Sequence, residues 1–207
     1  MIRFLIDQAS KARGRIDEFR TIRRWDKLRS KGMHIGKNVH LPLSTHIDTS
    51  HCFLISIGDN SGFAENCVIL AHDAMPNEWL DATKIGRVII HESCLFGQGT
   101  YILPGVEIGP RVVVGVNSVI SSNIPPDSVA MGNPAKVICS LQDYLRYHRM
   151  ALKRAPKFPF YEYDINYITP EKKKEMIERL TGTFGYITGG YTAMVRDGKC
   201  LIRTKSD

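Results

Sequence analysis

The residues with the strongest case for chemistry are His72 and Asp73, in the stretch CVILAHDAMPNEWLDATKIG that runs from Cys67 to Gly86. Imidazole titrates near pH 6.5, so a neutral His72 can take a proton from a hydroxyl group close to neutral pH. A positioned base of this kind contributes about 10²–10⁴ in rate. Neighbours on a strand point to opposite faces, so Asp73 can orient His72 only if the chain turns there. Otherwise Asp73 contacts an acceptor or has a structural role.

The segments around His72 repeat every six residues, with an apolar residue at the head of each block and a small or β-branched residue four positions later. Helices need apolar residues every three or four positions, and ordinary strands every two. A period of six therefore predicts short strands joined by corners, which is the hexapeptide signature of a parallel β-helix with three strands per coil. The heads are Ile35, Leu41, Ile47 and Phe53, then after a slip of four Ile57, Phe63 and Ile69, and after His72 Ile90, Phe96, Ile102, Ile108, Val114 and Ile120.

The flanks follow other patterns, so we predict three parts: residues 1–31, 32–139 with a loop at 74–84, and 140–207. Residues 2–28 have the helical period of a basic amphipathic helix. Beyond Cys139 we predict a helix capped by Ser140, an aromatic and proline-broken segment that is extended or looped, and a short helix opening with Pro170. The end could form a hairpin that turns at Gly189-Gly190 or Asp197-Gly198.

Charge and cysteine content narrow the classes of function. The net charge is +7, yet residues 32–139 hold five Lys/Arg against nine Asp/Glu, while residues 1–31 hold ten against four. A nucleic-acid-binding protein places its positive charge on the folded body, so we predict no nucleic acid partner. Five cysteines without a CxxC pair indicate no disulfide framework. We expect a cytoplasmic protein, and its basic termini leave open a peripheral contact with the inner face of the membrane.

Residues 95–138, LFGQGTYILPGVEIGPRVVVGVNSVISSNIPPDSVAMGNPAKVI, resemble the end of a left-handed β-helix acyltransferase. The family includes maltose, galactoside and capsular-polysaccharide O-acetyltransferases. The resemblance covers roughly residues 33–140, through ILPGVEIG, IPPDSV and GNPAKVI. It implies an all-β, left-handed parallel β-helix with an N-terminal helix and a mixed C-terminal extension. It also implies a homotrimer with acetyl-CoA as co-substrate.

The resemblance also implies roles for individual residues. The family's general base is a histidine just before an extruded loop, which matches His72. A backbone N–H early after the loop stabilises the oxyanion, which matches the amide of Gln98. The acetyl-CoA groove between subunits implies contacts at Gly97, Gly115, Ser121 and Lys136. Lys136 could instead be a solvated residue of the cap.

The sequence departs from the family pattern near the predicted groove. A lysine or another polar pair often stands where Ser121 and Ser122 are found here, and a glycine and a tryptophan often occupy the positions of His91 and Leu95. His91, with Asp73, is a candidate contact for the acceptor, although a solvent-facing corner residue is the alternative for His91. The missing tryptophan removes a flat wall beside the cofactor arm.

We therefore expect an O-acetyltransferase acting on a sugar hydroxyl, of a cell-surface polysaccharide or its lipid-linked precursor. N-acylation of an amino sugar is the alternative, and a non-catalytic or zinc-binding trimer is the second alternative, because some β-helix proteins are zinc enzymes. His34, His40 and His46 are spaced by six, whereas stacking in register takes eighteen residues, so these three side chains cannot share an ion. His46, His51 and His72 lack a supporting carboxylate pattern, and we predict no metal.

Overall fold

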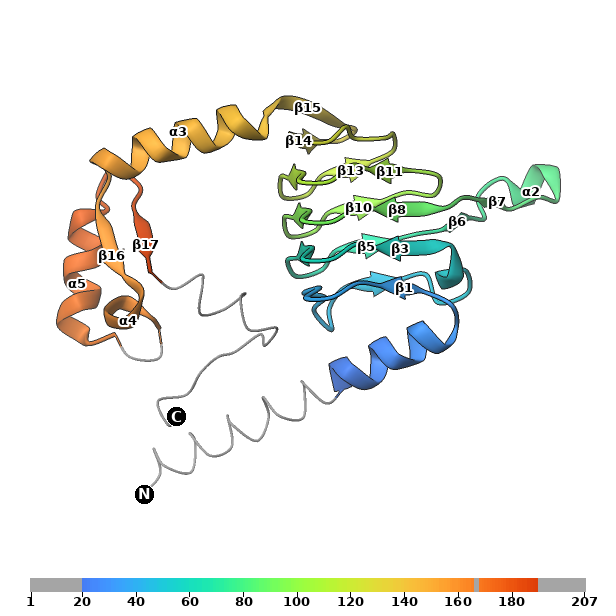
Figure 1. Ribbon diagram of the computed structural model, residues 1–207, viewed down its shortest axis with the longest axis horizontal. Helices are drawn as coiled ribbons and strands as arrows, with labels where there is room; N and C mark the ends of the chain where they lie inside the picture. Colours follow the sequence, from blue (N-terminus) through green and yellow to red (C-terminus); the bar gives the residue numbers. More distant parts are fainter. Residues whose placement is uncertain (1–19, 166–167, 190–207) are drawn as a thin grey trace, which may run out of the picture. The chain divides into compact units, whose positions relative to one another are not determined.

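The computed structural model describes residues 20–165 and 168–189, and the chain divides into two compact units, residues 1–141 and 142–207. In the first unit short strands stack into coils, and in the second unit helices surround two short strands (Figure 1). The first unit contains parallel sheets together with short helical segments, and the second unit mixes helices and strands. The finer division at residues 31 and 139 stays a prediction.

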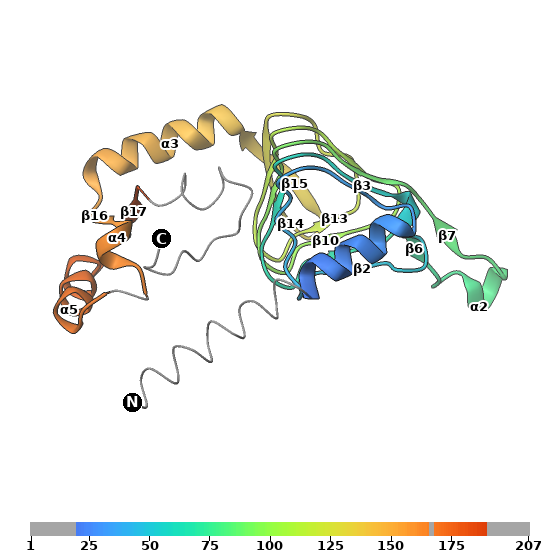
Figure 2. The ribbon, with the colours of Figure 1, turned by 60° about the horizontal axis from the view of Figure 1, so that its bottom comes forward.

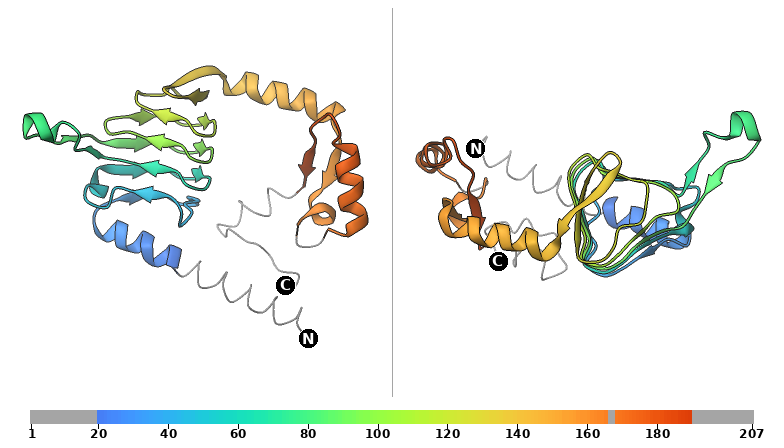
Figure 3. Two further views of the ribbon diagram at one scale, coloured as in Figure 1. Left: turned by 180° about the vertical axis from the view of Figure 1, so that it is seen from behind. Right: turned by 90° about the horizontal axis from the view of Figure 1, so that it is seen from above.

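Three sheets run along the stack of coils in the first unit. Sheet A contains β1 (His34–Ile35), β3 (Ile55–Ile57), β8 (Val88–Ile90) and β11 (Glu107–Ile108). Sheet B contains β4 (Gly62–Phe63), β9 (Leu95–Phe96), β12 (Val113–Val114), β14 (Ser128–Gly132) and β15 (Ala135–Ser140). Sheet C contains β2 (His46–Ile47), β5 (Val68–Ile69), β10 (Tyr101–Ile102) and β13 (Val119–Ile120). The chain passes through A, B and C in turn, and strands of successive coils pair in parallel. The result is the predicted parallel β-helix, whose triangular outline is seen in Figures 2 and 3.

The three corners between the sheets position the candidate residues, and we name them by the sheets that they join. The AB corner contains residues 36–39, 58–61, 91–94 and 109–112. The BC corner contains residues 42–45, 64–67, 97–100 and 115–118. The CA corner contains residues 48–54, 70–87, 103–106 and 121–123.

The repeat heads form the core, with one exception. Twelve of the thirteen predicted heads are buried, from Ile35 to Ile120, and the small residues between them are buried as well. The rings of Phe63 and Phe96 stack 4.5 Å apart across successive coils. Phe53 was predicted as a head and this was wrong, because its side chain is 57% exposed. It lies in the short 3-10 helix η1 (Cys52–Leu54) at the CA corner, where four extra residues postpone the next strand.

Both ends of the stack are covered. Residues 20–30 form a helix that extends two residues beyond the predicted end, while the rest of the predicted helix lies outside the described residues. Leu28 from this helix is buried in the core, and the Arg24 guanidinium donates to the carbonyls of Leu43 and Thr45. At the other end β15 turns back antiparallel on β14. The helix covers one end of the core, and β15 extends sheet B at the other end.

The second unit begins within helix α3 (Leu141–Arg154), which confirms a helix after Ser140. The segment predicted to be extended forms β16 (Lys157–Pro159) and then a short helix, α4 (Phe160–Tyr163), so the expectation of no helix there was wrong. Helix α5 (Pro170–Arg179) opens with Pro170, and its cap is Thr169. Strand β17 (Tyr186–Thr188) pairs in parallel with β16.

The small core of this unit centres on Phe158, which is fully buried beside Tyr163 and under the Arg179 guanidinium. The two turns of the predicted C-terminal hairpin involve residues 190–207, which lie outside the described residues. Within residues 20–165 and 168–189, every helix is too short or too polar to span a bilayer. Contact of the basic termini with a membrane surface stays a prediction.

Candidate active site

The period breaks after β5 because the chain leaves the coil as a two-stranded arm, residues 72–85. Strand β6 (His72–Asp73) pairs antiparallel with β7 (Lys84–Ile85), so that His72 faces Ile85. Between them the short helix α2 (Asn77–Leu80) forms the tip, and Figure 3 shows the arm projecting from the triangular stack. The predicted loop at 74–84 is therefore partly regular structure. His72 stands at the base of this arm, on the CA corner.

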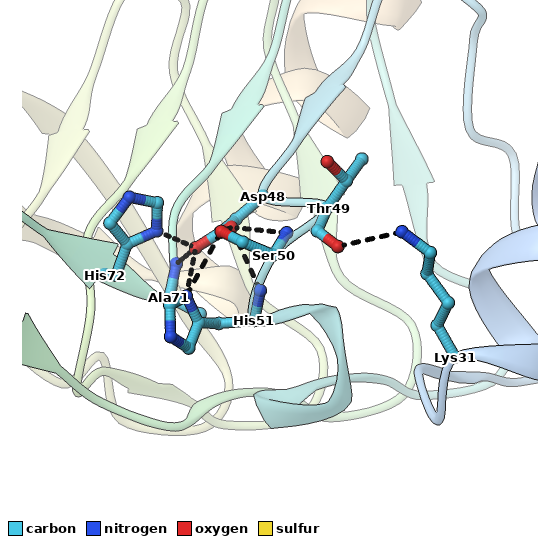
Figure 4. A network of polar contacts seen from close by, with 7 residues as sticks. All are labelled: Lys31, Asp48, Thr49, Ser50, His51, Ala71 and His72. Atoms are coloured by element: carbon cyan, nitrogen blue, oxygen red, sulfur yellow. Dashed lines mark hydrogen bonds and ion pairs between the residues drawn. The ribbon is translucent and has the colours of Figure 1, made fainter.

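Asp48, from the same corner of the preceding coil, holds His72 (Figure 4). One carboxylate oxygen, Oδ2, lies 2.5 Å from His72 Nδ1 and accepts the Ala71 amide at 3.1 Å. The other oxygen, Oδ1, accepts the Ser50 amide and hydroxyl and the His51 amide at 3.1, 2.7 and 3.1 Å. The side chain of Asp48 is 1% exposed, whereas that of His72 is 33% exposed. A buried, fully bonded carboxylate thus anchors a half-exposed imidazole.

The protonation states follow from this network. Burial alone raises the pKa of the Asp48 carboxyl, but the hydrogen bonds that it accepts from Ser50, His72 and the backbone outweigh burial and hold its pKa well below the ordinary value. An ionised carboxylate can only accept, so the shared proton belongs to His72 Nδ1. In a neutral imidazole the other nitrogen, Nε2, then keeps its lone pair and can act as a base.

Asp73 does not orient His72. Its Oδ1 accepts the Met75 amide at 3.0 Å and so shapes the start of the arm. The orienting carboxylate is Asp48, which the sequence reasoning missed. The pairing of Ile47 with Ile69 places Asp48 at the same corner as the residues that precede His72, so the signal lay in the register of the coils.

The predicted oxyanion donor lies at another corner. Gln98 follows β9 at the BC corner, so sheet C separates it from His72 within one chain. Its carbonyl accepts the Asn117 amide of the next coil, and among the described residues its own N–H has no partner. The amide is therefore available to a ligand, but not beside His72 of the same chain.

Three of the predicted cofactor contacts gather near Gln98. A side chain on Gly97 would come within 2.6 Å of the Val116 backbone, and one on Gly115 within 2.8 Å of Met131 Cβ. Stacking of the coils thus accounts for both glycines, whatever else they contact. Lys136 is exposed on β15 opposite Met131, at the same end of sheet B.

The other two predicted residues lie elsewhere. Ser121 is exposed at the CA corner, two coils beyond His72 and on the same side of the stack. His91 lies at the AB corner, where its Nε2 is 2.8 Å from Glu107 Oε1. Within one chain His91 is therefore separated from His72 by sheet A, and its interaction with Glu107 supports the role of a corner residue.

Known proteins share the repeat pattern. Residues 87–122 match the model of the bacterial transferase hexapeptide, six repeats. The match implies the left-handed coil that the resemblance predicts.

Relatives of these hexapeptide coils carry acetyltransferase names. The "Putative acetyltransferase YvoF" of Bacillus subtilis is 32% identical over 111 residues, which is 54% of this chain and 62% of that protein. The galactoside O-acetyltransferase of Lactococcus lactis is 31% identical over 121 residues, 55% of each chain. A crystal structure of a maltose O-acetyltransferase from Clostridium difficile has a TM-score of 0.47 and 27% identity, covering 56% of this chain and 74% of that one. The chain thus spans less than two thirds of the length of the Bacillus subtilis and Lactococcus lactis relatives.

Proposed function

We propose that this protein is an acetyl-CoA-dependent O-acetyltransferase that acts on a sugar hydroxyl, in the assembly of a surface polysaccharide or its lipid-linked precursor. The proposal rests on the Asp48–His72 pair at the break in the hexapeptide coil, where Asp48 Oδ2 lies 2.5 Å from His72 Nδ1. The galactoside O-acetyltransferase relative supports a sugar acceptor.

In this mechanism His72 Nε2 removes the proton of the acceptor hydroxyl as its oxygen attacks the thioester carbonyl of acetyl-CoA. Asp48 keeps the proton on Nδ1 and stabilises the imidazolium that forms. The tetrahedral intermediate then collapses, the C–S bond breaks, and the departing CoA sulfur takes the proton from His72. The acetyl group remains on the acceptor oxygen.

The negative oxygen of that intermediate needs a hydrogen-bond donor. We assign the Gln98 amide, and because it lies at a different corner from His72, the donor comes from a neighbouring copy of the chain. In a homotrimer the BC corner of one copy faces the CA corner of the next. Gly97, Gly115 and Lys136 then line the acetyl-CoA side of the site, and Asp73 and Ser121 the side of His72. His91 lies at the AB corner, away from both His72 and Gln98, so it would contact only an acceptor long enough to reach that corner.

Calorimetric titration with acetyl-CoA, followed by turnover on a panel of sugars and amino sugars, tests the proposal. We expect about one acetyl-CoA per chain, with binding kept in His72→Ala while turnover falls by about 10²–10⁴. His46→Ala is the matched control, because His46 is an exposed histidine on β2. Absence of binding, or equal turnover in His72→Ala, contradicts the proposal. Products formed only on amino groups would replace O-acylation by N-acylation.

Mixed oligomers test the contribution of the second copy. Gln98→Pro removes the donor N–H, and His72→Ala removes the base, so each variant alone should be inactive. When the two are co-expressed, about a quarter of the interfaces in a cyclic trimer combine an intact His72 with an intact Gln98. We expect turnover to return in the mixture. If mixing restores nothing although both variants bind acetyl-CoA and assemble, the donor is not in a neighbouring copy.

A further inference from the structure

A second histidine stands beside His72 without a place in the proposed mechanism. His51 directly precedes the short helix η1, at the same corner and one coil before His72. The two imidazole rings have centroids 4.9 Å apart and are inclined by 45°. Figure 4 shows both rings beside the Asp48 carboxylate. His51 Nδ1 lies 3.9 Å from Asp48 Oδ2, too far for a direct hydrogen bond, and 3.2 Å from the Ser50 hydroxyl.

Asp48, His51 and His72 have the chemistry and the spacing of a metal site, so the expectation that His51 and His72 lack a supporting carboxylate was wrong. Asp48, His51 and His72 each offer one ligand atom, and these atoms lie within 4.8 Å of one another. Two imidazoles and a carboxylate are a ligand set that zinc uses, with bonds of about 2.0–2.2 Å. Tetrahedral ligands at such bond lengths stand about 3.3 Å apart. Asp48 Oδ2 lies 2.5 Å from His72 Nδ1 and 3.9 Å from His51 Nδ1, and these two distances lie on either side of that value.

Access and charge also favour an ion. The side chains of His51 and His72 are 30% and 33% exposed, so an ion can reach them from solvent and keep water ligands. Asp48 is held rigidly by the Ser50 and Ala71 amides, which fixes one ligand oxygen in advance. Its negative charge is buried, and among the described residues no Lys or Arg pairs with it.

We propose that Asp48, His51 and His72 bind one divalent transition-metal ion, such as Zn²⁺, and that this ion switches off the base. The ion bonds to His72 Nδ1 in place of the proton, and the proton is taken up at Nε2, so the imidazole stays neutral. An Nε2 that carries a proton cannot accept one from a hydroxyl. The binding site stands on its own, whereas the loss of catalysis rests on the proposed function.

Zinc calorimetry on the full chain, free of affinity tags and stripped by a chelator, tests the binding. We expect one ion per chain. Loss of even an outer-shell partner of a metal typically costs about 10–100-fold in affinity, so His51→Gln should weaken binding at least that much. His34→Gln is the matched control, because His34 is an exposed histidine on β1. Equal binding by wild type and His51→Gln, or no binding at all, overturns the site.

Nitrogen-15 NMR of the histidine rings tests the switch without any acceptor. Before zinc is added, His72 should carry its proton on Nδ1, and with zinc bound it should carry it on Nε2. A ring that keeps the Nδ1 proton in the zinc-loaded protein overturns the switch. In turnover assays zinc should inhibit wild type at the calorimetric midpoint and spare His51→Gln. Zinc binding by a protein that acetylates nothing on the panel would uphold the site and count against the proposed function.

Discussion

Replacing Asp48 by asparagine should damage both stability and catalysis, because the carboxylate accepts hydrogen bonds on both sides. Its Oδ1 accepts hydrogen bonds from the Ser50 amide and hydroxyl and from the His51 amide. Its Oδ2 accepts hydrogen bonds from the Ala71 amide and from His72 Nδ1. An asparagine of the same shape has only one oxygen. If that oxygen stays with Ser50 and His51, the new NH₂ group faces the donors of Ala71 and His72.

The cost in stability follows from the donors left over. The buried Ala71 N–H loses its acceptor, and an unsatisfied buried donor costs about 1–3 kcal/mol. The bonds that remain lose their ionic character, which roughly halves their strength. We therefore expect the free energy of unfolding of Asp48→Asn at neutral pH to fall by about 2–4 kcal/mol. Asp59→Asn is the control, because Asp59 is exposed at the AB corner and accepts, within the described part of the chain, a single hydrogen bond from the Lys37 amide.

The cost in catalysis follows from the tautomer. His72 Nδ1 would now have to accept from the amide, so its proton moves to Nε2 and the base is lost. The same substitution in the serine-protease triad lowers kcat by about 10⁴, and for Asp48→Asn we expect about 10²–10⁴. CoA release measured by chromatography should show the loss in kcat, with the affinity for acetyl-CoA unchanged by calorimetry. A folded Asp48→Asn with kcat within threefold of wild type would refute the reasoning.

Three further predictions concern the coils, each read from urea denaturation. Gly97→Ala should destabilise by about 1–3 kcal/mol through its clash with the next coil, whereas Gly62→Ala, which would meet only one flexible side chain at 3.2 Å, should change little. Thr45 is buried, and its hydroxyl has no partner among the described residues, so Thr45→Val should stabilise by about 1 kcal/mol. At the equivalent corner Thr100 donates to a carbonyl at 2.7 Å, so Thr100→Val should destabilise instead. Burial raises the pKa of the Cys94 thiol to about 11. Unfolded thiols ionise near pH 8.5, so from pH 8 to 10 wild type should lose about 1–2 kcal/mol more stability than Cys94→Ala. Equal losses in the two proteins would contradict this.

The fold could be predicted because a period of six is a local property of the chain. Each apolar head from Ile90 to Ile120 is buried where the pattern puts it, since every coil repeats the same three strands. The prediction was wrong at Phe53 because six-residue spacing continues through a corner that the chain in fact lengthens. The slip of four before Ile57 shows that residues are inserted, but not where they lie. The pairing of Ile57 with Ile35 places them in the corner that contains Phe53.

The site was harder to predict because its parts come from different coils. His72 could be found from the interrupted period and its neighbours in sequence. Asp48 could not be found in this way, because it precedes His72 by a whole coil and looks like an ordinary turn aspartate. Asp73 was considered because it is adjacent, yet adjacent residues on an extended strand diverge. Register between β2 and β5 is the missing information.

The geometry of the coil also explains why one chain holds only part of the proposed site. Residues that stack at one corner come from successive coils, as Asp48 and His72 do, so a base and its orienting carboxylate can form within a single chain. An oxyanion donor must instead face the base from across the substrate, and the interior side of His72 is filled by the buried core. The Gln98 amide, at the next corner, can take that place only from another copy. If the proposed function holds, the same triangular packing that builds the Asp48–His72 pair also makes catalysis depend on assembly.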